Sequence, residues 1–179
     1  MEDLFAGLDI STQGQKIVII DLEKRSVIYS DSINYDVDLP KYSTLNGVLK
    51  DTDIGVSESN PNMWIDSLHL LFERLKTSSD IIQSIKSISV AGQQHGLVAI
   101  DKDGNLAKST SKLWNDFSTA EECEILTNEI GGSEQMITEV ANSQRTGYTA
   151  SKIFHMYRNE RELYDNTEHF LLVHNYINW

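Results

Sequence analysis

Short runs rich in apolar residues alternate with short polar turns in three closely spaced stretches at the start of the chain. Leu4–Ile10, Lys16–Leu22 and Ser26–Tyr35 are each predicted to form a β-strand, and short polar turns separate them. Connections this short join antiparallel neighbours. The pattern therefore predicts a three-stranded antiparallel meander.

The period changes in the next part of the chain. Residues 36–61 are polar and interrupted by glycine and proline, which is typical of a long loop or insertion. A helix then begins at Asn60-Pro61, because asparagine is a good N-cap and proline suits the first helical position. Its buried face is expected to contain Trp64, Leu68, Leu71, Phe72 and Leu75.

Strands and helices follow in mixed order. Further strands are expected at Ser84–Ala91, Leu97–Asp101, Lys112–Trp114 and Glu168–Val173. Because strands do not alternate regularly with helices from the start, we expect an α/β fold with a mixed sheet rather than a regular doubly wound one.

Three helices are predicted between the last strands. Ser118 and Glu121 have capping-box spacing, and they open a helix expected to bury Ala120, Cys123, Leu126 and Ile130. A second helix is expected from Ser133. A third begins near Thr149, and its inward side chains are expected to be Ile153, Phe154 and Tyr157.

Composition narrows the classes of function. The 179 residues have a formal net charge of -12, which disfavours a nucleic-acid partner. A single cysteine excludes an internal disulfide and a multi-cysteine zinc site. Neither a secretory signal nor a run of roughly 18 apolar residues is visible, so we expect no membrane partner and a cytoplasmic location.

The first candidate site is the turn between the first two strands. Asp9 ends a strand, and the small polar turn that follows can present backbone N–H groups to an anion while the carboxylate holds Mg²⁺. An ordinary hairpin with a turn-capping aspartate explains the same residues. The other polar residues of this segment are Ser11, Thr12, Gln13 and Lys16.

Two further segments carry polar side chains suited to a polyol. One follows a strand and contains Gln93, Gln94, His95 and Gly96; the other contains Trp114, Asn115 and Asp116. Ligands of open α/β sheets bind outside strand ends, and an aromatic platform beside amides suits a sugar. A solvated turn and a core tryptophan are the structural alternatives. A fourth segment, Arg145–Lys152, reads as a turn and helix start, with Lys152 as a surface residue.

Taken in order, the four segments resemble the FGGY carbohydrate kinases. DISTQGQK resembles the phosphate-facing hairpin of that family, and AGQQHG resembles the substrate loop of its xylulokinases. LWND resembles the next sugar-facing segment, and GYTASKI resembles Gly-Phe-Thr-Ala-Pro-Lys. Three positions depart from the family pattern: Ser11 replaces a common glycine, Gln94 a frequent methionine and Ser151 a common proline.

The resemblance implies an actin-like (ribonuclease H-like) ATPase domain and an ATP- and Mg²⁺-dependent kinase. Asp9 would act near Mg²⁺ and the transferred phosphate, and Gln94 and His95 would contact a ketose, D-xylulose first among them. The ATP phosphates would be bound by Ser11, Thr12, Gln13 and Lys16. It also implies that the chain, 1–179, is a truncated N-terminal lobe whose catalytic base and C-terminal partner lobe lie elsewhere. The isolated chain is then expected to be inactive and able to form a homodimer.

Two alternatives remain open from the sequence. A related kinase could act on ribulose, glycerol or another polyol. A non-catalytic actin-like interaction module could use the same fold without chemistry.

Overall fold

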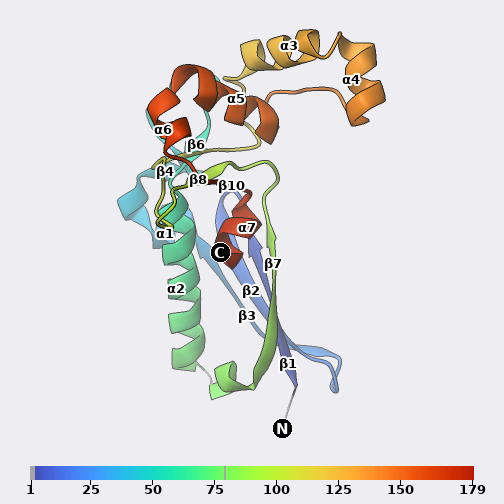
Figure 1. Cartoon of the computed structure of the whole chain (residues 1–179). Helices are drawn as coiled ribbons and strands as arrows, with labels where there is room; N and C mark the ends of the chain where they lie inside the picture. The colour runs from blue at the N-terminus through green and yellow to red at the C-terminus, as the bar shows by residue number, and fades with distance from the viewer. Residues whose placement is uncertain (1–2, 79) are drawn as a thin grey trace. The chain divides into compact units, whose positions relative to one another are not determined.

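The computed structural model describes residues 3–78 and 80–179 (Figure 1). These residues form two compact units. The first unit combines the chain up to Lys50 with Asn60–Gln93 and Val173–Trp179, and the second combines Asp51–Ser59 with Gln94–Leu172.

A four-stranded sheet organises the first unit. It contains β1 (Leu4–Ile10), β2 (Gly14–Asp21), β3 (Ser26–Asn34) and β7 (Ile85–Gly92), in the order β3-β2-β1-β7. The first three strands are antiparallel neighbours, whereas β7 runs parallel to β1 (Figure 1). The predicted α/β fold with a mixed sheet that opens in three antiparallel strands is confirmed.

One face of this sheet is covered by α2 (Pro61–Ser78), which packs against β2 and β3. The Asn60 side chain accepts a hydrogen bond from the Asn62 backbone N–H at 2.9 Å, so the predicted helix start is confirmed. A 3₁₀ turn, η2 (Asp80–Ser84), and the helix α7 (Val173–Asn178) complete this part. The core between sheet and helix consists of Leu4, Ala6, Leu8, Ile10, Ile17, Ile19, Met63, Trp64, Leu71 and Leu75.

The segment expected to be an irregular loop contains short regular elements. They are α1 (Tyr35–Asp38), the 3₁₀ turn η1 (Pro40–Tyr42), and the strands β4 (Thr44–Leu45), β5 (Val48–Leu49) and β6 (Glu58–Ser59). Asp36 holds the β4–β5 hairpin through its carboxylate. It accepts hydrogen bonds from the Thr44 hydroxyl at 2.7 Å and the Gly47 N–H at 3.1 Å. A carboxylate within the polar segment thus orders it, and this could not be predicted from its turn-rich composition.

The second unit contains short strands and four helices. The strand β8 (Val98–Ile100) pairs with β10 (His169–Leu171), and β6 pairs with β9 (Ser111–Lys112). The helices are α3 (Ala120–Glu129), α4 (Ser133–Val140), α5 (Thr149–Asn159) and α6 (Arg161–Asp165). Leu97, Ala99, Ala107 and Met156 form a core cluster that includes β8 and α5.

The predicted inner face of α3 is wrong. Ala120 is exposed and Cys123 only half-buried, whereas Glu122 is buried. Its carboxylate accepts hydrogen bonds from Arg158 at 2.9 Å and Asn159 at 3.2 Å, which compensates its burial. The capping box is also wrong, because Thr119 rather than Ser118 is the N-cap. Neither hydroxyl caps the helix: Ser118 donates to Asp116, and Thr119 hydrogen-bonds Ser151.

The predicted inner face of α5 is confirmed for Ile153, which packs against the core cluster, but it is wrong for Tyr157. Tyr157 is 44% exposed, and the buried residues of this helix are Ser151, Lys152 and Met156. Lys152 is therefore not a surface residue. Ser151 hydrogen-bonds the Thr119 hydroxyl at 2.9 Å, so the residue that replaces a proline links α5 to the start of α3.

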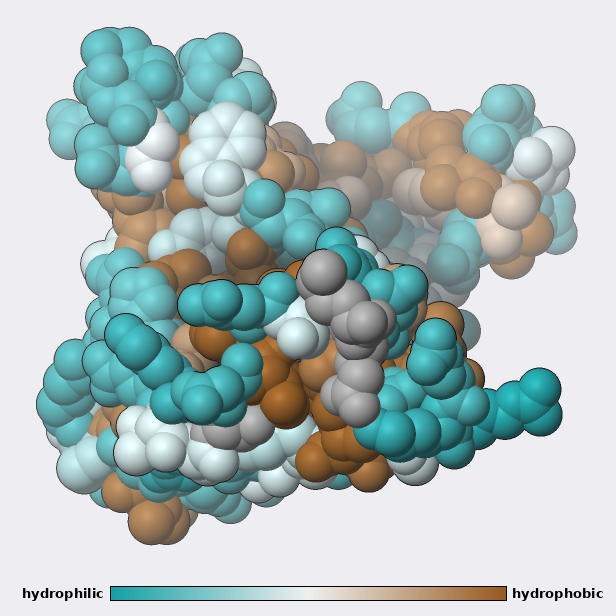
Figure 2. Space-filling view, turned by 90° about the horizontal axis from the view of Figure 1, so that it is seen from below, coloured by the Kyte–Doolittle hydropathy of each residue, from teal (hydrophilic) through white to brown (hydrophobic). Residues whose placement is uncertain are grey.

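Figure 2 shows one surface of the molecule, where hydrophilic residues (teal) surround apolar patches (brown). The edge strands of the first unit leave apolar side chains exposed, including Val27 and Ile28 on β3 and Ile88 on β7. Of the helices in the described ranges, none combines the length and apolarity needed to cross a membrane.

Candidate functional site

The first candidate site is the β1–β2 turn of the first unit. The Ser11 N–H donates to the Gly14 carbonyl at 2.9 Å and closes the turn. A side chain at Gly14 would place its Cβ 2.3 Å from the Ile33 carbonyl, so close packing of β3 requires glycine here. Ser11 is not among the described residues with positive φ, and the serine therefore fits a position where glycine is common.

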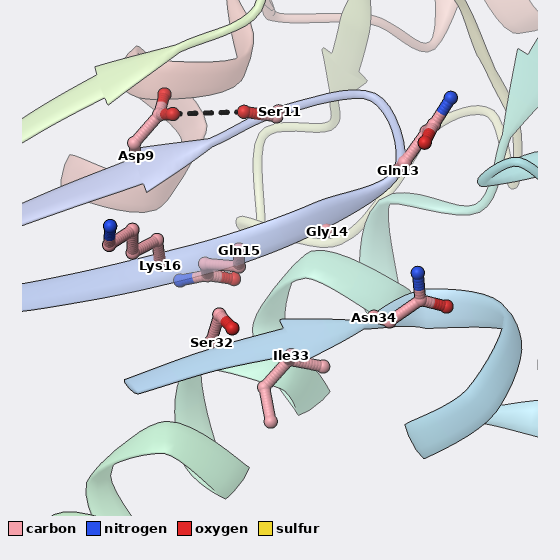
Figure 3. A pocket seen from close by; sticks show the side chains of 9 residues that line it. All are labelled: Asp9, Ser11, Gln13, Gly14, Gln15, Lys16, Ser32, Ile33 and Asn34. Atoms are coloured by element: carbon pink, nitrogen blue, oxygen red, sulfur yellow. Dashed lines mark hydrogen bonds between the residues drawn. The ribbon is translucent and has the colours of Figure 1, made fainter. Parts of the chain in front are cut away.

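An open hollow of about 300 Å³ lies beside this turn (Figure 3). Asp9 and Lys16 are cross-strand partners in the β1–β2 register, so their side chains share one face of the sheet. The Ser11 hydroxyl donates to the Asp9 carboxylate at 2.9 Å. A carboxylate, a hydroxyl and an ammonium group thus meet at this hollow, which is lined by Asp9, Ser11, Gln13, Gly14, Gln15, Lys16, Ser32, Ile33 and Asn34.

Buried polar residues support the turn from beneath, and the sequence did not reveal them. The fully buried Tyr35 donates its hydroxyl to the Ser11 carbonyl at 3.4 Å, and burial raises the pKa of this phenol. Ser67 of α2 donates to the Gln15 side chain. The turn therefore rests on groups from β2, α1 and α2, which limits its movement.

Two other segments touch Thr12 at the tip of the turn. The Thr12 hydroxyl donates to the Gln93 side chain at 3.2 Å, and the Gln93 N–H extends the β1–β7 ladder to Ile10. Gly47 of the β4–β5 hairpin has φ of +76°, and a Cβ there would lie 1.8 Å from the Thr12 carbonyl. Gln93 thus lies beside the β1–β2 turn, in a different unit from Gln94 and His95.

The second candidate site, in the second unit, includes the turn around His95. His95 has φ of +58°, which is unusual for a residue with a side chain. Its ring stacks on Tyr148, with 4.5 Å between centroids. Burial lowers the pKa of His95, and the charge of Lys152 lowers it further. Gln94 is exposed, whereas Gly96 is buried.

The segment Trp114–Asp116 lies in the same unit. The Trp114 side chain is 51% exposed and available to a ligand, so it is not a core residue. Asp116 is fully buried and accepts hydrogen bonds from the Ser57 N–H at 2.8 Å and the Ser118 hydroxyl at 2.6 Å. Asn115 accepts from the Ser57 hydroxyl at 2.8 Å. Asp116 therefore fixes the loop that presents Trp114.

The segment before α5 packs directly on Trp114. Gly147 has φ of +82°, and a Cβ there would lie 2.1 Å from the Trp114 carbonyl. The same segment supplies Tyr148 beneath His95 and Lys152, whose ammonium donates to the His95 carbonyl at 2.5 Å. Three of the four sequence segments therefore converge in this unit. The described residues contain no group of three or more His, Cys, Asp or Glu side chains placed to hold a metal ion.

Solved structures share this fold. The chain superimposes on a xylulose kinase from Rhodospirillum rubrum with a TM-score of 0.82, at 20% identity, over 98% of this chain and 33% of the other. A xylulose kinase from Bifidobacterium adolescentis gives a TM-score of 0.79 at 23% identity over 99% and 34%. The actin-like ATPase fold that the resemblance implied is confirmed.

Curated relatives are similar over nearly the whole chain. A xylulose kinase of Schizosaccharomyces pombe is 36% identical over 97% of this chain and 34% of its own length. One from Haemophilus influenzae is 32% identical over 98% and 34%. The chain thus spans about a third of the length of these relatives.

The family itself follows from a sequence profile. Residues 4–179 match the profile described as "FGGY family of carbohydrate kinases, N-terminal domain". The match extends over both units and includes all four segments singled out above. This chain therefore belongs to the FGGY family of carbohydrate kinases.

Proposed function

We propose that the chain is the N-terminal lobe of a kinase that transfers the γ-phosphoryl group of ATP to a terminal hydroxyl of D-xylulose, giving D-xylulose 5-phosphate. The observation that carries the proposal is the convergence of His95, Trp114 and the segment before α5 in one unit. Relatives named xylulose kinase support the choice of sugar.

The nucleotide side of the proposal rests on the β1–β2 turn. Mg²⁺ in kinases is commonly held by one or two carboxylates together with water and substrate phosphates, so it needs no cluster of protein ligands. Asp9, with Ser11 beside it, suits this role, and Lys16 adds a positive charge for a phosphate. Thr12 and Gln13 at the tip would lie along the ATP phosphates. Bound Mg²⁺ would neutralise charge on the transferred group.

The sugar side rests on the exposed Trp114 and Gln94 and the half-buried His95 of the second unit. Trp114 offers an apolar platform, and Gln94 and His95 offer amide and imidazole groups to hydroxyls. The lowered pKa of His95 favours the neutral ring, which can both donate and accept a hydrogen bond. We assign Asn115 to the same sugar-binding surface. Gly96 would let the sugar approach the backbone closely, and Asp116 would hold the surface in place.

Several parts of this proposal concern the whole protein. The base that accepts the hydroxyl proton and most of the adenine site would lie in a C-terminal lobe, and the isolated chain would be inactive. Homodimer formation and a cytoplasmic location also stay predictions. Release of ADP from ATP with D-xylulose tests the activity: steady turnover by the isolated chain contradicts the assignment of the base to another lobe.

Sugar binding by the chain is the direct test. Saturation-transfer NMR with D-xylulose should show contact, and Trp114→Ala should weaken binding by about tenfold, the loss of roughly 1.4 kcal/mol. Phe117→Ala is the matched control, because Phe117 is also an exposed aromatic residue of this unit, at 62%. Equal loss in both variants would argue against a sugar contact at Trp114.

The alternatives are separated by a ligand panel. D-ribulose or glycerol bound more tightly than D-xylulose would favour a related kinase. Absence of binding to all three sugars and to Mg²⁺-ATP would favour the interaction module.

A further inference from the structure

Lys152 occupies an unusual position for a lysine. It lies in the first turns of α5, its side chain is fully buried, and its ammonium donates to the carbonyls of His95 at 2.5 Å and Lys112 at 3.3 Å. Buried lysines are normally paired with a carboxylate. Here both partners are neutral carbonyls.

The surroundings do not favour a cation at this place. Burial lowers the pKa of Lys152 to about 8; the charge of Asp116 acts in the opposite direction, and that of Lys112 adds to the lowering. The positive end of the α5 dipole also disfavours a cation near the helix start. Asp116 is already occupied by hydrogen bonds from Ser57 and Ser118. The cost of burying the ammonium is therefore offset mainly by its hydrogen bonds to the two carbonyls, and these bonds fix where the two carbonyls lie.

One carbonyl lies within a sugar-facing segment, and the other lies directly before the second such segment. His95 lies in the turn of Gln94 and Gly96, where its positive φ needs support. Lys112 immediately precedes Leu113 and Trp114, and its carbonyl also accepts the Leu97 N–H at 3.1 Å. The Lys152 ammonium is thus a direct link between the two segments.

We propose that Lys152 is a positioning residue of the sugar site, which joins the His95 turn to the Trp114 segment and so sets the separation of their ligand-facing side chains. This inference rests on the proposed function, in which both segments contact the ketose. Lys152 itself need not touch the sugar.

The test combines a readout without ligand and one with ligand, on the whole 179-residue chain. Lys152→Met keeps an unbranched apolar side chain next to Leu97 and Met156 but removes all N–H donors. Amide exchange of residues 94–97 and 112–116 should then accelerate at least tenfold. Incorporated 5-fluorotryptophan gives a ¹⁹F resonance for each of the three tryptophans, and the Trp114 signal, assigned with Trp114→Phe, should shift.

Lys108→Met is the matched control. Lys108 is a lysine of the same unit whose side chain is 13% exposed, and its ammonium pairs with the carboxylates of Glu160 at 2.6 Å and Glu58 at 3.7 Å rather than with a backbone carbonyl of either sugar-facing segment. It should leave exchange of both segments and the Trp114 signal unchanged. Lys152→Arg, which retains charge and donors, should recover part of the D-xylulose affinity that Lys152→Met loses, an expected loss of about tenfold.

The outcomes separate the two proposals. Unchanged exchange and an unchanged Trp114 signal in a folded Lys152→Met protein overturn the positioning role, whatever the sugar does. Faster exchange of both segments in Lys152→Met supports the link even if the unmodified chain binds no D-xylulose, and in that case the proposed sugar site fails instead. Equal effects of Lys152→Met and Lys108→Met reduce Lys152 to a general structural role and overturn the inference.

Discussion

Burial of Lys152 should make the free energy of unfolding increase with pH in the alkaline range, and replacing Lys152 should remove this increase. The folded chain holds this proton with a pKa of about 8, against an ordinary value of 10.5, chiefly because burial disfavours the ammonium. Between these two values the unfolded chain binds a proton that the folded chain lacks. The free energy of unfolding therefore increases with pH through this window.

The magnitude follows from the two pKa values. The interval from about 8 to 10.5 corresponds to about 3.5 kcal/mol, at about 1.4 kcal/mol per pH unit. Below pH 8 both states are protonated and the whole cost of burying the ammonium is present. Above pH 10.5 the cost is gone. Relative to Lys152→Met, the unmodified chain should therefore gain about 3.5 kcal/mol across this range.

Urea unfolding of both proteins at a series of pH values measures this gain, because other titrating groups cancel in the difference between them. NMR of ¹³Cε-labelled lysine reports the titration of Lys152 directly. Lys102→Met, at a largely exposed position, controls for the loss of a cation. A difference that is flat or decreases between pH 8 and 10 would refute the claim that the Lys152 ammonium is desolvated in the folded chain.

Three further changes test other contacts. Gly47→Ala should cost about 2 kcal/mol, because its Cβ would lie 1.8 Å from the Thr12 carbonyl at a φ of +76°; urea unfolding measures the loss, and a cost under about 0.5 kcal/mol contradicts the packing. Asp116→Asn should cost about 2 kcal/mol by the same assay, since a buried carboxylate with several donors loses its charge, and a neutral result would mean that those bonds contribute little. Glu122→Gln should cost about 1 kcal/mol and should expose Arg158 to solvent, measured by faster guanidinium exchange in NMR; unchanged exchange would show that Glu121 alone holds the arginine.

Local periodicity was sufficient where one face of an element is apolar and buried. The strands β1 to β3 and the helix α2 were predicted within about two residues, because short apolar runs bounded by turns mark the strands and helical spacing of apolar residues marks the buried face of α2. The polar segment 36–61 was predicted less well. Its short hairpin depends on the Asp36 carboxylate, and hydrogen bonds of this kind leave no periodic pattern in the sequence.

Buried charges account for the main errors in the second unit. Pattern analysis assigns charged residues to the surface, yet Glu122, Asp116 and Lys152 are all buried. Each is compensated by a distant partner: Arg158 lies 36 residues from Glu122, and His95 lies 57 residues from Lys152. Sequence spacing carries no information about such pairs.

The groups that the sequence identified differ from those that it missed in the distance, along the chain, to the atoms with which they interact. Candidates such as Asp9, Trp114 and the half-buried His95 stand in short motifs, because the backbone around them needs turns and glycines. Supporting groups such as Tyr35 and Lys152 act on backbone carbonyls from other elements. Their side chains could belong to any helix or strand. Motifs therefore mark the candidate surfaces, while only the tertiary structure identifies the buried polar residues that set the geometry of those surfaces.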